Sequence, residues 1–165
     1  MTTTPASEPI GGQSTLNYTT DAPGMDATIK TEWLDDLRSG NFHQGEGKLH
    51  TSTRNEDGTE RHEFCCLGVL CERAVAAGIV ERVDVSDDYA AGEDHKVYAY
   101  APTEGPNAGV PYPHYPPPAV AAWAGLPAGD TNPYVDTDTG RRVIANVNDE
   151  GTTFTDLADM IENQF

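Results

Sequence analysis

The sequence predicts a single α+β domain, in which a central cysteine-containing helix packs with an N-terminal and a C-terminal helix against short antiparallel strands and hairpins. Three observations support this class: an apolar stripe at helical spacing within residues 64–80, two further amphipathic helical segments at 26–38 and 154–165, and short strand-like segments separated by glycine turns. With 165 residues the chain can bury one core without disulfides or metals. We expect residues 26–165 to form this domain.

The segment FCCLGVLCERAVAAGIV at residues 64–80 is the most apolar continuous stretch of the chain. In a helix, a single stripe would collect the residues spaced i, i+3, i+4, i+7 and i+8, which are Leu67, Leu70, Cys71, Ala74 and Val75. Glu72 and Arg73 fall off this stripe. Gly78 provides a stop signal, because glycine readily takes the left-handed conformation that ends helices. We therefore place the central helix here.

Residues 1–25 are rich in Thr, Ser, Pro and Gly and contain neither lysine nor arginine. Such a segment cannot bury enough apolar surface to offset the entropy lost on ordering, so we expect a disordered or loosely docked arm. An arm that orders by wrapping a partner subunit is the functional alternative.

Residues 26–38 predict an amphipathic helix with Asp26 as its N-cap. A hairpin is expected to follow, with strands at about 48–54 and 60–64. Gly58 offers the positive φ that its turn requires. The second strand of this hairpin would lead directly into the central helix.

Two short strands, at 81–85 and 96–101, are expected after the central helix, with an acidic loop between them. Residues 102–118 contain seven of the twelve prolines, which makes this segment stiff, extended and unsuited to a sheet interior. A short helix should follow it, and we interpret Trp123 in this helix as a core anchor.

A second hairpin is predicted over residues 133–147, with Gly140 in its turn. The last predicted helix begins at a capping pair, Thr153 and Asp156. Its apolar residues repeat at helical spacing through Phe165.

The formal net charge of −17, from 27 acidic and 10 basic residues, makes the surface negative. Direct binding to nucleic acid is disfavoured because counterion release requires lysines and arginines that face phosphates, and an anionic membrane would repel the chain. Three interpretations remain: a salt-adapted surface, which we favour, an acidic partner for a basic protein, or a mimic of nucleic acid.

The three cysteines are odd in number and lie close together between residues 65 and 71, which argues against a disulfide framework and favours a reducing compartment. We see neither a signal peptide nor a run of apolar residues long enough to span a membrane. The chain is therefore expected in the cytoplasm.

Cys65 and Cys66 lie at the start of the central helix, where the helix dipole favours a thiolate. With His62, or with His95 or His114, and an orienting Asn or Asp, they offer the residue types of a cysteine-dependent hydrolase. The preferred interpretation is a buried pair at a strand-to-helix junction, since cysteine is among the most often buried residues. We predict no catalytic residues beyond these candidates.

A metal site from His62, Cys65, Cys66 and Cys71 is disfavoured, because Cys71 lies on the packed stripe and no second ligand pair completes a tetrahedron. We therefore predict no metal and no cofactor.

The start of the central helix has no Ser, Thr, Asn or Asp as a cap, so some of its N–H groups need another partner. The end of the preceding hairpin is the simpler partner. A bound anion is the alternative, held at Cys65 and Cys66 with help from Gln44, Lys48 and Arg61.

Asn148 and Asp149 precede the last helix in the pattern Asn-Asp-x-Gly. A turn in which their side chains bond to nearby backbone groups explains these residue types. Contact with a ligand is the alternative.

Four motifs together are familiar: Trp33 followed by QGxGxL at 44–49, FCCLGVLC at 64–71, AWAGL at 122–126, and NDxGxxF at 148–154. In this combination the chain resembles a family of small accessory proteins encoded by tailed phages and prophages of actinobacteria. The resemblance covers roughly residues 30–165. It implies a viral origin, a common fold and a location in the infected host cell, and it supplies no catalytic residues.

From these observations we expect a phage accessory protein that binds, without catalysis, a host protein, a phage protein or a small metabolite such as an anion. A cysteine-dependent hydrolase is one alternative. A virion or assembly component, or an acidic mimic of nucleic acid, is another.

Overall fold

The computed structural model describes residues 24–165, so the arm predicted at 1–25 lies outside the described residues apart from Gly24 and Met25. Met25 is buried in the core, and the backbone N–H of Asp26 bonds to Ala124 O at 2.9 Å. The order of elements is α1 (Ala27–Arg38), β1 (His43–Gln44), β2 (His50–Arg54), β3 (Glu60–Phe64), α2 (Cys66–Ala76), β4 (Val80–Asp84), η1 (Ser86–Tyr89), β5 (His95–Pro102), α3 (Pro118–Ala124), η2 (Pro127–Gly129), β6 (Tyr134–Thr137), β7 (Gly140–Val143), α4 (Ile144–Asp149) and α5 (Phe154–Gln164).

The predicted α+β class is confirmed. A five-stranded sheet has the order β1-β3-β2-β5-β4, and β6 and β7 form a separate hairpin. All neighbouring strands are antiparallel except β1 and β3, which are parallel. The strand β1 was not predicted. Its two residues carry too little alternation to be recognised.

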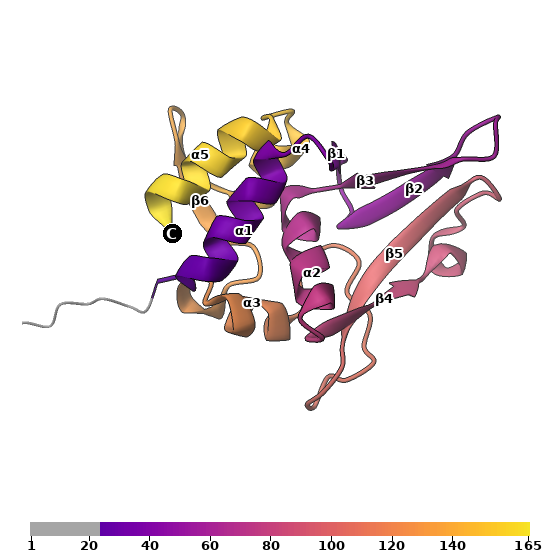
Figure 1. Cartoon of the computed structure of the whole chain (residues 1–165), viewed down its shortest axis with the longest axis horizontal. Coiled ribbons are helices and arrows are strands. Elements are labelled where there is room, and N and C mark those ends of the chain that lie inside the picture. The colour runs from indigo at the N-terminus through magenta and orange to yellow at the C-terminus, as the bar shows by residue number, and fades with distance from the viewer. Residues whose placement is uncertain (1–23) are drawn as a thin grey trace, which may run out of the picture.

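Helix α2 lies between the five-stranded sheet and a group formed by α1, α3, α4 and α5 (Figure 1). From Cys66 to Cys71 every residue of α2 is buried, so the buried surface is wider than the predicted stripe. Gly68 shows how closely it packs: a Cβ built there would lie 1.8 Å from the carbonyl oxygen of Leu49.

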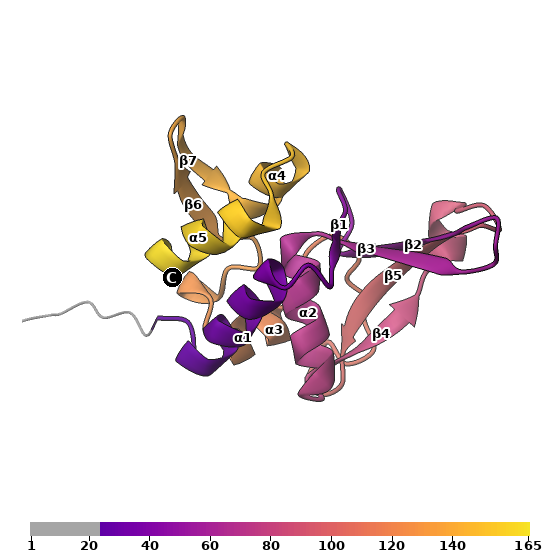
Figure 2. The same ribbon diagram turned by 45° about the horizontal axis from the view of Figure 1, so that its top comes forward.

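The two flanking helices are confirmed. In α1, Asp26 accepts hydrogen bonds from the N–H groups of Thr28 and Ile29, and the fully buried Trp33 donates from Nε1 to Cys66 O at 2.9 Å. Helix α5 runs beside α1 (Figure 2), and its N-cap Thr153 accepts from the N–H of Asp156.

The prediction for residues 133–147 was partly wrong. Strand β7 ends at Val143, and the residues IANVND that follow form helix α4 instead of continuing the strand. Three buried residues explain the helix, since Ile144, Val147 and Asn148 lie at spacings of three and four.

Contrary to the prediction, the proline-rich segment is not extended throughout: after β5 ends at Pro102 the chain turns back, and the N–H groups of Gly109 and Val110 bond to Pro102 O at 2.9 Å and to Asn107 O at 3.0 Å. It nevertheless pairs with the sheet at one point, where Tyr112 exchanges two backbone hydrogen bonds with Tyr100. Trp123 in α3 is only partly buried, so it packs against the core from its edge. In the described part of the chain, no helix has the length and apolar character needed to cross a bilayer.

Candidate functional site

The start of helix α2 is capped by groups of the protein itself. Cys65 is the N-cap, and its Sγ accepts from the N–H of Gly68 at 3.4 Å. Asn148 Oδ1 accepts from the N–H of Cys66 at 3.1 Å. The N–H of Cys65 itself donates to Leu49 O, at the start of the preceding hairpin. The missing cap is therefore supplied by the thiol of Cys65 and by a distant amide, whereas the hairpin bonds only to the N–H of the cap residue itself. These N–H groups need no anion.

Asn148 is fully buried and uses both ends of its side chain. Its Nδ2 donates to Gly45 O at 2.9 Å and to Asp149 Oδ1 at 3.1 Å. Gln44 Nε2 donates to Asn148 Oδ1 at 3.2 Å and to Thr152 O at 2.7 Å. The side chain of Asn148 does bond to backbone groups, but to groups far away in the sequence, so it joins three segments instead of closing a local turn.

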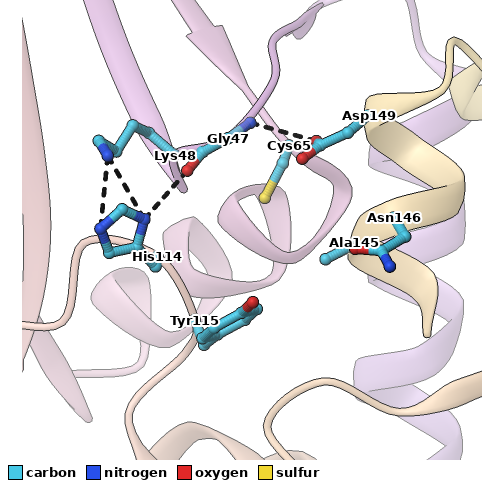
Figure 3. Close-up of a pocket in the computed structure, with 8 residues that line it drawn as sticks. All are labelled: Gly47, Lys48, Cys65, His114, Tyr115, Ala145, Asn146 and Asp149. Atoms are coloured by element: carbon cyan, nitrogen blue, oxygen red, sulfur yellow. Dashed lines mark hydrogen bonds between the residues drawn. The ribbon is translucent and has the colours of Figure 1, made fainter.

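A polar pocket of about 50 Å³ lies next to the start of α2 (Figure 3). Its lining comes from the segment before β2, the end of the proline-rich segment, helix α4 and the N-cap of α2. The residues are Gly47, Lys48, Cys65, His114, Tyr115, Ala145, Asn146 and Asp149. Three of the predicted ligand-binding residues, Lys48, Cys65 and Asp149, therefore line one pocket.

The other predicted ligand-binding residues lie elsewhere. Gln44 and Asn148 support the pocket through the hydrogen bonds described above, and Cys66 is buried beneath it. Arg61 is exposed on β3, where its Nε lies 3.4 Å from Glu63 Oε1, and it does not line the pocket.

The imidazole of His114 is held by neighbours on both nitrogens. Nδ1 lies 3.1 Å from Gly47 O, which assigns the proton to this nitrogen, because a carbonyl can only accept. Nε2 is then an acceptor, 3.3 Å from Lys48 Nζ and 3.3 Å from Tyr89 Oη. The ring is therefore fixed against Lys48.

The thiol of Cys65 is only 4% exposed. Burial raises its pKa to about 11, against a smaller lowering by the N–H groups of Gly68 and Leu67. Burial also raises the pKa of Cys66 and Cys71 well above the ordinary value. All three thiols are therefore protonated at neutral pH, which is the opposite of the activation that a nucleophilic cysteine requires.

His62, the histidine next to the cysteines in sequence, belongs to a second polar cluster. Its Nδ1 lies 2.8 Å from Nε2 of His50, a residue that is 1% exposed. The ring of His50 is stacked between Phe64 and Tyr98, with centroids 4.1 and 4.4 Å away. The side chain of His62 therefore contacts His50 on the neighbouring strand and does not line the pocket.

Glu72 supplies a carboxylate on the inner side of this cluster. Tyr100 Oη donates to Glu72 Oε1 at 2.5 Å and lies 3.5 Å from Nδ1 of His50. Arg82 forms a bidentate pair with Glu72. Burial lowers the pKa of His50 to about 3, with further lowering by the positive charge of Arg82 and by the neighbouring His62.

Sequence reasoning missed this cluster and the place of Tyr115 in the pocket. The available signal was the spacing of His50 and Ser52, which places both on one face of the predicted strand. In the structure that face is buried. Among residues 24–165, no group of three or more His, Cys, Asp or Glu side chains is arranged to hold a metal ion.

Comparison with known proteins gives one match. Residues 25–165 fit the family model described as a domain of unknown function, DUF8296. No curated protein and no solved structure matches the chain significantly. Because the family model spans nearly the whole described domain, the chain belongs to the DUF8296 family.

Proposed function

We propose that this protein is a non-catalytic binding protein that recognises its ligand or partner at the pocket beside the start of α2, and that it serves as an accessory protein of a tailed phage of actinobacteria. The proposed origin is supported by the four sequence motifs quoted above. The proposed binding role is supported by the pocket, and above all by the state of Lys48.

Lys48 has an unusual position for a cation in so acidic a chain. Most basic side chains form ion pairs with carboxylates; these are Arg38, Arg54, Arg61, Arg73, Arg82, Lys96 and Arg142. Within the described residues Lys48 forms no such pair, and its Nζ lies 3.3 Å from His114 and 4.4 Å from the centroid of the Tyr89 ring. Its charge is therefore not neutralised by a carboxylate, and it lies at the edge of the pocket, beside His114 and the Tyr89 ring.

The walls of the pocket are held by backbone hydrogen bonds. The N–H of Leu49 donates to Pro113 O at 2.9 Å, and Tyr112 is bonded to Tyr100 on both sides, which fixes the segment that carries His114. Asn148 fixes the opposite wall. A preformed site of this kind avoids the entropy cost of ordering loops when a ligand binds.

The same geometry favours binding over hydrolysis. The pKa of Cys65 is raised, and the imidazole of His114 directs its nitrogens to Gly47, Lys48 and Tyr89. A hydrolase would need a thiolate and a base that can take its proton.

Native mass spectrometry of the protein purified from infected cells tests the binding role. We expect a bound species on the wild type that is lost in Lys48→Gln, because this change removes the free charge. Lys96→Gln is the matched control, since Lys96 pairs with Glu60 3.3 Å away and does not line the pocket. A wild type that is empty in repeated preparations would contradict the proposal.

Purified phage particles separate the accessory role from a structural one. We expect the protein in infected-cell lysates and not in washed virions. Its presence in virions in a fixed ratio to the capsid protein would favour the assembly alternative.

A further inference from the structure

The hairpin of β6 and β7 stands apart from the five-stranded sheet and packs beside α5 (Figure 2). Within residues 24–165, β6 pairs with no strand other than β7. Pro133 O accepts the N–H of Ile144, so Tyr134 and Asp136, at the alternate positions of β6, direct their backbone groups away from β7. The outer edge of β6 therefore presents N–H and C=O groups to which another strand can bond.

One side chain already occupies part of this edge in the way that a strand would. Gln164 Nε2 donates to Asp136 O at 3.2 Å, and Gln164 Oε1 accepts the N–H of Asp136. An amide side chain has the same donor and acceptor as a peptide group, so Gln164 imitates one residue of a neighbouring strand. The backbone of Tyr134 forms no hydrogen bond to another segment among the described residues. The edge is thus open at Tyr134 and held by a displaceable side chain at Asp136.

A groove follows this edge, between β6 and the C-terminal half of α5. Two hollows of about 470 and 590 Å³ adjoin each other at Asp136, Asn163 and Gln164, which line both. Each is within the range of roughly 300–1,000 Å³ that is typical of ligand sites. The first hollow also includes Phe165 and Tyr134, whose side chain is 49% exposed. An extended chain laid along β6 would therefore contact both the strand edge and the helix.

The charges along the groove select its partner. Its carboxylates outnumber its single cation, Arg141, and they belong to Asp130, Asp136, Asp138, Asp156 and Asp159. Within residues 24–165, Asp136, Asp138 and Asp156 form no ion pair. The guanidinium carbon of Arg141 lies 5.2 Å from the centroid of the Tyr134 ring. A second copy of this chain would place like charges across the new strand pair, which is destabilising, whereas a basic segment is attracted.

We propose that the outer edge of β6 binds an extended, basic segment of another protein as an added strand. The backbone of this segment pairs with Tyr134 and, once Gln164 is displaced, with Asp136. Main-chain bonds supply affinity in this mode of recognition, and alternate side chains supply specificity. Lysines or arginines of the segment meet the carboxylates of Asp136, Asp138 and Asp156, and the net charge of −17 draws the segment in at long range. No residue lines both this groove and the pocket beside α2.

Fluorescence anisotropy with a short synthetic peptide that alternates lysine and threonine tests the proposal on the full chain. We expect this peptide to bind and a glutamate–threonine peptide not to bind. Methylation of alternate backbone nitrogens of the lysine peptide should weaken binding at least about tenfold, because it removes the strand hydrogen bonds and keeps the charge. Equal binding of the methylated peptide would overturn strand addition, and so would a lysine peptide that does not bind.

Paired charge variants locate the site. Asp136→Asn combined with Asp138→Asn should weaken binding of the lysine peptide about fivefold, because two carboxylates of the groove are lost. Asp87→Asn combined with Asp88→Asn is the matched control, since these exposed residues lie in η1, outside the groove, and the net charge changes equally. Equal effects of the two pairs would show that only net charge matters, and would contradict a site at β6.

Gln164→Ala should have the opposite effect. It frees the N–H and C=O of Asp136, so the lysine peptide should bind about fivefold more tightly. Hydrogen exchange followed by NMR should show a slower exchange of the Tyr134 amide when the peptide is bound. Weaker binding in this variant, or an unprotected Tyr134 amide, would overturn the strand geometry. A dimer of the protein that the peptide dissociates would assign the edge to a second copy and overturn the proposal as well.

Discussion

The side chain of Asn148 accepts a hydrogen bond from the backbone N–H of Cys66, a residue 82 positions earlier in the chain. Through this bond, helix α4 supplies a second capping group for α2, in addition to the thiol of Cys65. The same amide holds the loop at Gly45 and the carboxylate of Asp149. One buried side chain thus joins the fold to the candidate site.

Asn148→Ala should therefore lower the free energy of unfolding by about 2–4 kcal/mol, because it leaves the buried N–H of Cys66 and the carbonyl of Gly45 without partners. Urea denaturation measures the change. Asn146→Ala, an exposed position on the same helix, is the control and should change stability by less than about 0.5 kcal/mol. Equal effects of the two changes would contradict the capping role.

Gly68→Ala should be more damaging, since the new methyl group would lie 1.8 Å from the carbonyl oxygen of Leu49. The helix and the strand must separate to accommodate it, and we expect a loss of about 3 kcal/mol or more, or failure to fold. Circular dichroism with thermal unfolding measures this. Gly92→Ala has open space around its Cβ position and is expected to be nearly neutral. A fully stable Gly68→Ala protein would show that α2 is not packed as described.

Stability should fall with acidification through His50. Its pKa is about 6.5 in the unfolded chain and about 3 in the folded protein, so between these values only the unfolded chain binds the proton. The stabilisation is fully present above pH 6.5 and is lost progressively as the pH falls toward 3, by roughly 3–5 kcal/mol in total.

Urea unfolding at several pH values tests this with His50→Gln, which keeps a hydrogen-bonding group for His62 but cannot titrate. The unfolding free energy of this variant should depend less on pH than that of the wild type in the same window. His95→Gln, a change at an exposed histidine on β5, should leave the pH dependence as it is. Parallel curves for wild type and His50→Gln would refute the role of His50.

Cys65 should react slowly with iodoacetamide in the folded protein at neutral pH. A pKa of about 11 in place of 9 reduces the thiolate fraction about 100-fold, and burial slows access further. Mass spectrometry of the alkylated protein over time measures the rate, with the urea-unfolded protein as the reference. Faster alkylation than in the unfolded chain would instead support the cysteine-dependent hydrolase.

Much of the fold follows from patterns within single segments. Apolar spacing predicts α1, α2 and α5, and the turn at Gly58 with its alternating flanks predicts the hairpin of β2 and β3. The error at residues 144–147 has a local cause: this segment, IANV, contains β-branched residues that favour a strand, and packing against α2 and α5 makes it helical.

The candidate site was less predictable because its parts are distant in sequence. The sequence predicts Lys48 and Cys65 together, as an anion site at the start of the central helix, and Asp149 separately, from its turn motif. No local pattern indicates that these residues share a pocket with His114. The pairing of His50 with Tyr100 and Glu72 likewise depends on strand order, which the sequence alone does not reveal.

The 82-residue separation between Cys66 and its capping amide also has a consequence for synthesis on the ribosome. When α2 emerges, neither Asn148 nor helix α5, which packs against α1, has yet been translated. Because domains generally fold as units, the nascent chain must keep its most apolar segment without a complete core until residues 144–165 are made. We therefore expect nascent chains that stop before residue 144 to be sensitive to protease and to bind chaperones, and the completed domain to become resistant.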